Sequence, residues 1–85
     1  MTDTEIQLFV LFKSATVRLD AIAEDYFGLS PKTACERALL NKLPIPAFRL
    51  GTTQKAPWMV SISDLAAHID NAKQSAAELW EKSQV

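Results

Sequence analysis

The chain has 85 residues, enough for one domain with one modest hydrophobic core. Apolar residues make up 48% and charged residues 22% of the chain, which is the composition of a folded globular protein and argues against disorder. The net charge of −1 excludes a uniformly basic protein with a general attraction to nucleic acid.

The first predicted element lies in the dense apolar run TEIQLFVLFKS, residues 4–14. Periodicity alone does not distinguish a buried helix from a strand in so short a run. We favour a helix that begins near Thr2 or Thr4. The next residues, 15–19, include the β-branched Thr16 and Val17 and favour a short extended segment.

Two short helices separated by three residues are predicted next. Asp20 is the expected N-cap of a helix over residues 21–27, and Gly28 can close that helix by adopting the left-handed conformation. Ser30 and Pro31 have the capping hydroxyl and the preset φ angle that start another helix. This spacing is that of a helix-turn-helix.

A helical step of 100° per residue divides this second helix into two faces. The residues expected to pack inward are Ala34, Cys35, Ala38 and Leu39. The residues expected to face outward are Thr33, Glu36, Arg37 and Leu40, with Lys32 on the flank. Arginine can pair with guanine, a carboxylate can accept from cytosine, and an apolar group can meet the thymine methyl, so the outer face could read bases. Any amphipathic helix also has a solvated polar face.

Pro44 and Pro46 prevent the helix from continuing. Residues 47–50 and 58–61 are predicted as paired strands joined by a polar loop over residues 51–57, which together form a β-hairpin. Alternation along the strands predicts that Arg49 faces outward. The residues expected to face the core are Phe48, Leu50, Trp58 and Val60.

Ser61 and Asp64 have the spacing of a capping box at the start of a long helix over residues 62–82. Its apolar residues repeat at spacings of four and three, as in a short coiled coil: Leu65, Ile69, Ala72, Ala76 and Leu79. The second half has more apolar surface than the core needs, so self-association is expected there. The expected contact residues are Ala72, Ala76, Leu79 and Trp80. The apolar residues 9–12 are an alternative surface for association.

Charge is distributed unevenly along the chain. Residues 1–29 carry a net charge of −3, residues 30–55 carry +4, and residues 56–85 carry −2. The basic third coincides with the second helix and the hairpin, where contacts to phosphates would fall. Chance differences between three short segments are the alternative explanation.

The sequence offers little support for catalysis, metal binding or a cofactor. His68 is the only histidine and lies in the middle of the last helix, and Cys35 is expected on an inward face. One cysteine and one histidine do not suffice for a metal site, and two glycines 23 positions apart do not form a phosphate loop. We therefore expect a protein that is not an enzyme and has no cofactor.

The cysteine count and the absence of a long apolar run bear on the compartment. A single cysteine excludes an internal disulfide and fits a reducing environment. No apolar run approaches the roughly 20 residues that a bilayer-spanning helix needs, and MTDTEIQLF lacks the basic start of a signal peptide. We expect a cytoplasmic protein with no membrane contact.

Residues 43–69 resemble the C-terminal half of excisionase-type winged helices. The shared elements are Leu43-Pro44, Phe48-Arg49-Leu50-Gly51, Trp58-Met59-Val60, and Ser61 with Asp64-Leu65. The whole chain resembles more closely the pyocin activator family of small phage regulators. The motifs for this are Asp25-Tyr26-Phe27, Gln54-Lys55-Ala56 and Asp64-Leu65-Ala66-Ala67, after an apolar N-terminal segment. Many excisionase wings are rich in arginine, whereas this loop offers only Lys55 between Gly51 and Trp58.

The resemblance and the residues together predict an α+β protein. We expect a single domain over residues 1–85, a small winged helix-turn-helix with a β-hairpin wing, an extra N-terminal helix and a long C-terminal helix. The expected DNA-binding residues are Ser30, Lys32, Thr33, Glu36, Arg37, Arg49, Thr52, Thr53, Gln54 and Lys55.

The resemblance implies a sequence-specific activator of transcription carried by a prophage or mobile element. Two alternatives stay open: a recombination directionality factor that assists an integrase, and a protein-interaction module such as an antirepressor. The expected partners are double-stranded DNA, further copies of the chain, and either RNA polymerase or an integrase.

Overall fold

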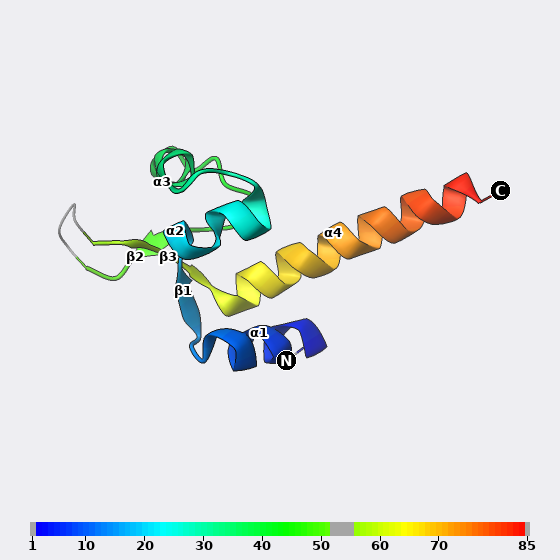
Figure 1. The fold of residues 1–85 in the computed structure, drawn as a ribbon, viewed down its shortest axis with the longest axis horizontal. Helices are drawn as coiled ribbons and strands as arrows, with labels where there is room; N and C mark the ends of the chain where they lie inside the picture. Colours follow the sequence, from blue (N-terminus) through cyan, green and yellow to red (C-terminus); the bar gives the residue numbers. More distant parts are fainter. Residues whose placement is uncertain (1, 52–55, 85) are drawn as a thin grey trace.

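The structure is a computed structural model that describes residues 2–51 and 56–84. Within these residues the chain is an α+β protein with four α-helices, one π-helical turn and a three-stranded antiparallel sheet (Figure 1). The elements in chain order are α1 (Asp3–Phe12), β1 (Thr16–Arg18), α2 (Leu19–Ile22), η1 (Ala23–Phe27), α3 (Pro31–Leu39), β2 (Phe48–Arg49), β3 (Trp58–Ser61) and α4 (Ile62–Ser83). The predicted loop residues Thr52, Thr53, Gln54 and Lys55 lie outside the described residues.

The N-terminal apolar run is a helix, as predicted. The Thr2 side chain caps α1 by accepting a hydrogen bond from the Glu5 amide at 3.1 Å. α1 packs against the first half of α4, and Leu8 is its buried residue. Two polar contacts join the helices: the Thr4 hydroxyl donates to the Asp70 carboxylate at 2.6 Å, and the Ser63 hydroxyl donates to the Glu5 carboxylate.

The sheet has the strand order β1-β3-β2, so β3 lies in the centre. Both strand pairs are antiparallel: Val17 is opposite Val60, and Phe48 is opposite Met59. The extended segment expected over residues 15–19 is therefore a third strand that pairs with the hairpin. A three-stranded sheet with an apolar face is far more stable than an isolated hairpin.

The prediction that Asp20 caps the first short helix is wrong. α2 begins two residues earlier than predicted, at Leu19, and its N-cap is Arg18. The reason is that β1 leads directly into the helix and places Leu19 in the core with no exposed surface. The Asp20 carboxylate instead accepts two hydrogen bonds from the Arg18 guanidinium, at 3.1 and 2.9 Å.

The turn between the two short helices is confirmed. Gly28 has a φ of 66°, and its amide donates to the Ala23 carbonyl to close η1. Ser30 caps α3 by accepting a hydrogen bond from the Thr33 amide at 3.2 Å, and Pro31 is the first helical residue.

The inward face of α3 is narrower than predicted. Ala34 and Ala38 are buried and allow α3 to lie close to α2, and Cys35 is half-buried. Leu39 was expected to pack inward but is 68% exposed. It follows Ala34 by five residues, which places it about 140° around the helix, outside the narrow contact that the alanines make.

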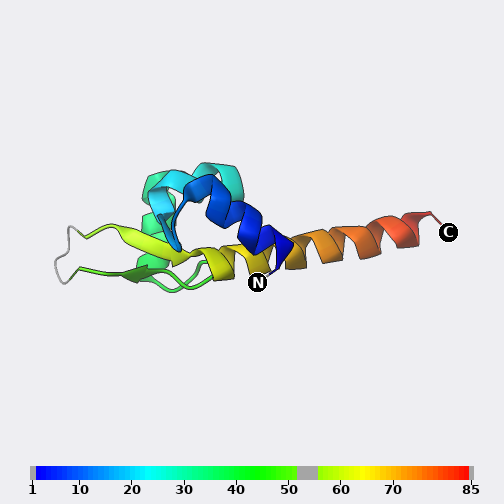
Figure 2. The same ribbon diagram turned by 90° about the horizontal axis from the view of Figure 1, so that it is seen from below.

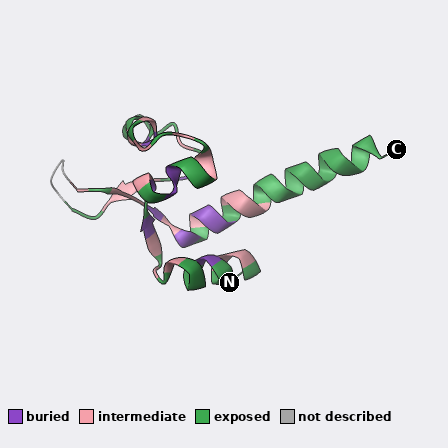
Figure 3. Cartoon of the chain, viewed as in Figure 1, coloured by how far each residue is buried: buried purple, intermediate pink, exposed green. Residues whose placement is uncertain are grey.

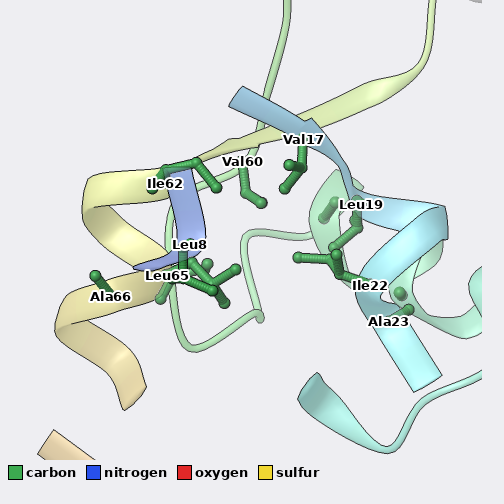
Figure 4. Packing of buried hydrophobic residues seen from close by; sticks show 12 residues of the cluster. Leu8, Val17, Leu19, Ile22, Ala23, Val60, Ile62, Leu65 and Ala66 are labelled. Carbon is green, nitrogen blue, oxygen red and sulfur yellow. The ribbon is translucent and has the colours of Figure 1, made fainter. Parts of the chain in front are cut away.

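The core is formed by residues from the helices, the sheet and one loop. Its largest fully buried side chains are Leu19, Ile22, Val60 and Leu65, which come from α2, β3 and α4 and converge in Figure 4. Ile45, between the two prolines, is also buried, and the sequence pattern did not identify it. Packing of this kind is the main favourable contribution to the stability of the domain.

α4 begins at the predicted cap, where the Ser61 side chain accepts from the Asp64 amide at 3.0 Å. Residues 71–84 are all exposed, and Figures 1 and 3 show this part of the helix projecting from the rest of the molecule. The radius of gyration is 14.5 Å, compared with about 12 Å for a compact chain of this length. Seen from below in Figure 2, the hairpin and the end of α4 lie at opposite ends of the molecule.

Candidate nucleic-acid interface

The polar face of α3 is the first part of the candidate interface. Lys32, Glu36 and Arg37 are all exposed, as predicted from the helical step, and Leu40 is 61% exposed beside them. The ion pairs of the described residues consist of Arg18–Asp20 alone, so neither cation of α3 is neutralised by a carboxylate of the described chain. The helix therefore presents two available cations, one carboxylate and apolar surface to solvent.

Ser30 and Thr33, at the start of α3, bind each other. The Ser30 hydroxyl donates to the Thr33 hydroxyl at 2.9 Å and also accepts from the Thr33 amide. These contacts fix the first turn of α3, where Pro31 has no amide hydrogen and the amides of Thr33 and Ala34 already donate to Ser30. Both residues were predicted to bind DNA. In the structure, their contacts with each other cap the helix.

The strand β2 presents its residues on the opposite faces from those predicted. Arg49 is opposite Trp58, and Phe48 is opposite Met59, so Arg49 shares the sheet face of Trp58 and Val60. Leu50 was expected to face the core but is 74% exposed. The strand ladder is offset by one residue from the pairing that the apolar pattern implied, and such an offset exchanges the faces of every residue in the strand.

Arg49 consequently does not extend freely into solvent. Its guanidinium carbon lies 4.4 Å from the centre of the Trp58 ring, an arrangement typical of a cation–π contact. Its Nε is buried and has no hydrogen-bond partner among the described residues. Arg49 forms no ion pair with a carboxylate of the described residues. The stacking partner Trp58 was missed because cross-strand register is not evident from the sequence.

The two ends of the hairpin loop lie close together. A Cβ atom placed on Gly51 would lie 2.9 Å from the Cβ of Ala56, so any residue other than glycine at this position would require a shift of the backbone. Figure 1 shows the hairpin at the same end of the molecule as α3. The elements that carry Lys32, Arg37 and Arg49, which are α3 and β2, thus lie at one end of the molecule, away from the tail of α4.

The structure gives the surroundings of the two residues considered for catalysis, His68 and Cys35. The His68 ring lies 5.7 Å from the Phe27 ring, and Cys35 is half-buried in α3. The described residues contain no group of three histidine, cysteine or acidic side chains placed to hold a metal ion. In the same part of the chain, no helix is long and apolar enough to cross a membrane.

An open pocket lies beside the end of α3, between Ala38 and the loop that carries Leu43, Ile45 and Ala47. Its lining consists almost entirely of apolar side chains and backbone atoms, and Asn41 contributes the polar side chain. It does not bring together the acid, base or nucleophilic groups that a reaction would need.

Comparison with known proteins gives one finding. No curated protein and no solved structure matches the chain. The sequence profile described as "Pyocin activator protein PrtN" matches residues 4–76, from the second residue of α1 to the tail of α4. Because this match covers most of the 85 residues, including all of the candidate interface, the chain belongs to the pyocin activator protein PrtN family.

Proposed function

We propose that this protein is a sequence-specific, double-stranded-DNA-binding activator of transcription from a prophage or related mobile element. The family supports a regulatory role in activation, not an enzymatic one. The observation that carries DNA binding is the exposed face of α3, with Lys32, Glu36 and Arg37, on a helix that lies at the same end of the molecule as the hairpin.

In this proposal the fold acts as a winged helix-turn-helix. α3 is the recognition helix, α2 supports it through Ala34 and Ala38, and the β2–β3 hairpin is the wing. Arg37 can donate two hydrogen bonds to a guanine, and Glu36 can accept one from a cytosine amino group. Lys32 and Arg49 bind phosphates and position the helix in the major groove. Thr52, Thr53, Gln54 and Lys55 extend the contact from the loop of the wing.

Activation further requires a contact with RNA polymerase in the cytoplasm, which is part of this proposal. The use of the same surface to bend or organise DNA for an integrase is the second candidate. Both functions need duplex DNA and α3, and they differ in the DNA segment that is bound.

The decisive experiment is a comparison of duplexes in a fluorescence anisotropy titration at several salt concentrations. One duplex carries a prophage promoter, one an attachment site, and one a scrambled sequence. We expect the promoter duplex to bind at least about a thousandfold more tightly than the scrambled one, as specific sites typically do. Equal affinity for all three would contradict sequence-specific activation, and tighter binding to the attachment site would favour the integrase role.

Arg49 provides a separate test of the wing. Because a phosphate contact releases a counterion, Arg49→Ala should reduce the slope of log K against log salt by about one unit and weaken binding to every sequence about equally. Arg18→Ala is the matched control. Arg18 lies on β1, the strand farthest from β2, and its guanidinium is paired with Asp20. An unchanged slope for Arg49→Ala would show that Arg49 serves only to pack on Trp58.

A further inference from the structure

The apolar face of α4 continues beyond the domain. Ile62, Leu65 and Ala66 are buried, and Ile69 packs partly against the core. At 100° per residue, the same face continues through four exposed residues, which we call the tail stripe: Ala72, Ala76, Leu79 and Trp80. The segment from Asn71 to Ser83 is about 20 Å long at the rise of an α-helix.

The described part of the chain leaves this stripe uncovered. α1 covers α4 only as far as Asp70, where the Thr4 hydroxyl is bound. Beyond this point Leu79 is 68% exposed and Trp80 is 64% exposed. The other side of the tail is polar, with Gln74 donating to Glu78 at 3.1 Å. A stripe of apolar side chains opposite a polar face is the pattern of a helix that packs against a partner.

We propose that the tail of α4 pairs with the tail of a second copy of this chain, antiparallel, with the two-fold axis near Ala76. In this arrangement Trp80 of each copy lies opposite the partner's Ala72, because the two positions are equally far from Ala76. The large ring then fits over a small residue at both ends of the contact. Parallel pairing would instead place the two Trp80 rings against each other and leave a gap between the alanines.

The charges of the tail also fit a second copy. Residues 71–84 carry two cations, Lys73 and Lys82, and two carboxylates, Glu78 and Glu81, so two tails do not repel each other.

The size of the contact determines how strong the pairing is. A buried tryptophan contributes about 150–250 Å² per copy, and two tails of this length form an interface at the low end of the range for specific complexes. Self-association in solution is therefore concentration-dependent. Once two copies bind adjacent DNA sites, the tail contact becomes effectively intramolecular and increases the overall affinity.

The test is sedimentation velocity of the full chain without DNA, at chain concentrations from about 1 µM to 1 mM. This range covers the dissociation constants of weak complexes. We expect a shift from monomer to dimer within this range, and no shift for the double variant Leu79→Ala, Trp80→Ala. Gln74→Ala, on the opposite face of the same helix, is the control and should dimerise like the parent. A monomeric parent, or a double variant that dimerises equally, would overturn the proposal.

Cysteine cross-linking tests the orientation in a Cys35→Ser background. Ala76→Cys should form an intermolecular disulfide, because the two positions meet at the axis, whereas Ser83→Cys should not, because antiparallel tails hold those residues about 20 Å apart. Efficient cross-linking through Ser83→Cys would overturn the antiparallel arrangement. Loss of dimers on Phe9→Ala with the tail variant unaffected would assign the interface to the exposed face of α1 instead. These measurements need no DNA, so their failure leaves the proposed DNA binding untouched.

Discussion

Replacement of Leu65 by alanine is expected to lower the free energy of unfolding by about 3 kcal/mol, within the range of about 2–5 kcal/mol for leucine truncations in cores. Leu65 has no exposed surface and lies among the converging core residues from α1, β3 and α2 (Figure 4). The truncation removes packing contacts and leaves a cavity, because a core of this size is too small to rearrange and fill it. Since a domain of this length is stable by only about 4–13 kcal/mol, the variant should lie close to its unfolding threshold.

The measurement is urea denaturation followed by circular dichroism, with Leu39→Ala as the matched control. The control makes the same chemical change on α3, at a leucine that is 68% exposed. We expect its stability to change by no more than about 0.5 kcal/mol. If both variants lost similar stability, Leu39 would lie in the core, as the helical pattern alone had suggested, and the observed face of α3 would be wrong.

The second large effect is expected at the proposed recognition helix. Arg37→Ala should weaken binding to the cognate duplex by about 1–3 kcal/mol, or roughly five- to 150-fold, and relax discrimination at one base pair. Lys32→Ala should weaken binding to all duplexes more evenly, because a lysine binds phosphate as a point charge. Both side chains are exposed and unpaired in the described structure, so the fold should be retained.

Anisotropy titrations of both variants, with circular dichroism to verify folding, provide the measurement. Lys73→Ala is the matched control, because it removes an exposed cation from the part of α4 that projects from the rest of the molecule. That control should bind a single site as the parent does. Native affinity for Arg37→Ala together with a native spectrum would show that α3 is not the recognition helix.

Local signals in the sequence were sufficient to predict the helix ends that depend on neighbouring residues. Ser30 with Pro31, Gly28, and Ser61 with Asp64 each satisfy backbone groups within one turn, and the structure confirms all three. The exception is Asp20, where the burial of Leu19 overrides the local capping preference. A cap depends on a few atoms close in sequence, whereas burial depends on the whole fold.

The candidate site was predicted less completely than the fold. The exposure of Lys32, Glu36 and Arg37 follows from helical geometry, and the structure confirms it. The environment of Arg49 does not follow from the sequence, because its contact with Trp58 depends on the register between β2 and β3. Short strands carry too few apolar residues to specify which face each residue takes.

The sequence by itself determined the order of the helices and the hairpin, the caps at Gly28, Ser30 and Ser61, and membership of the regulator family. These properties arise from interactions between residues close in the chain, or from the residue pattern as a whole. Only the tertiary structure decided that β1 joins the sheet, that Ile45 completes the core, and that Arg49 stacks on Trp58. Each of these depends on segments that are distant in sequence and meet only when the apolar surfaces of the domain are buried together.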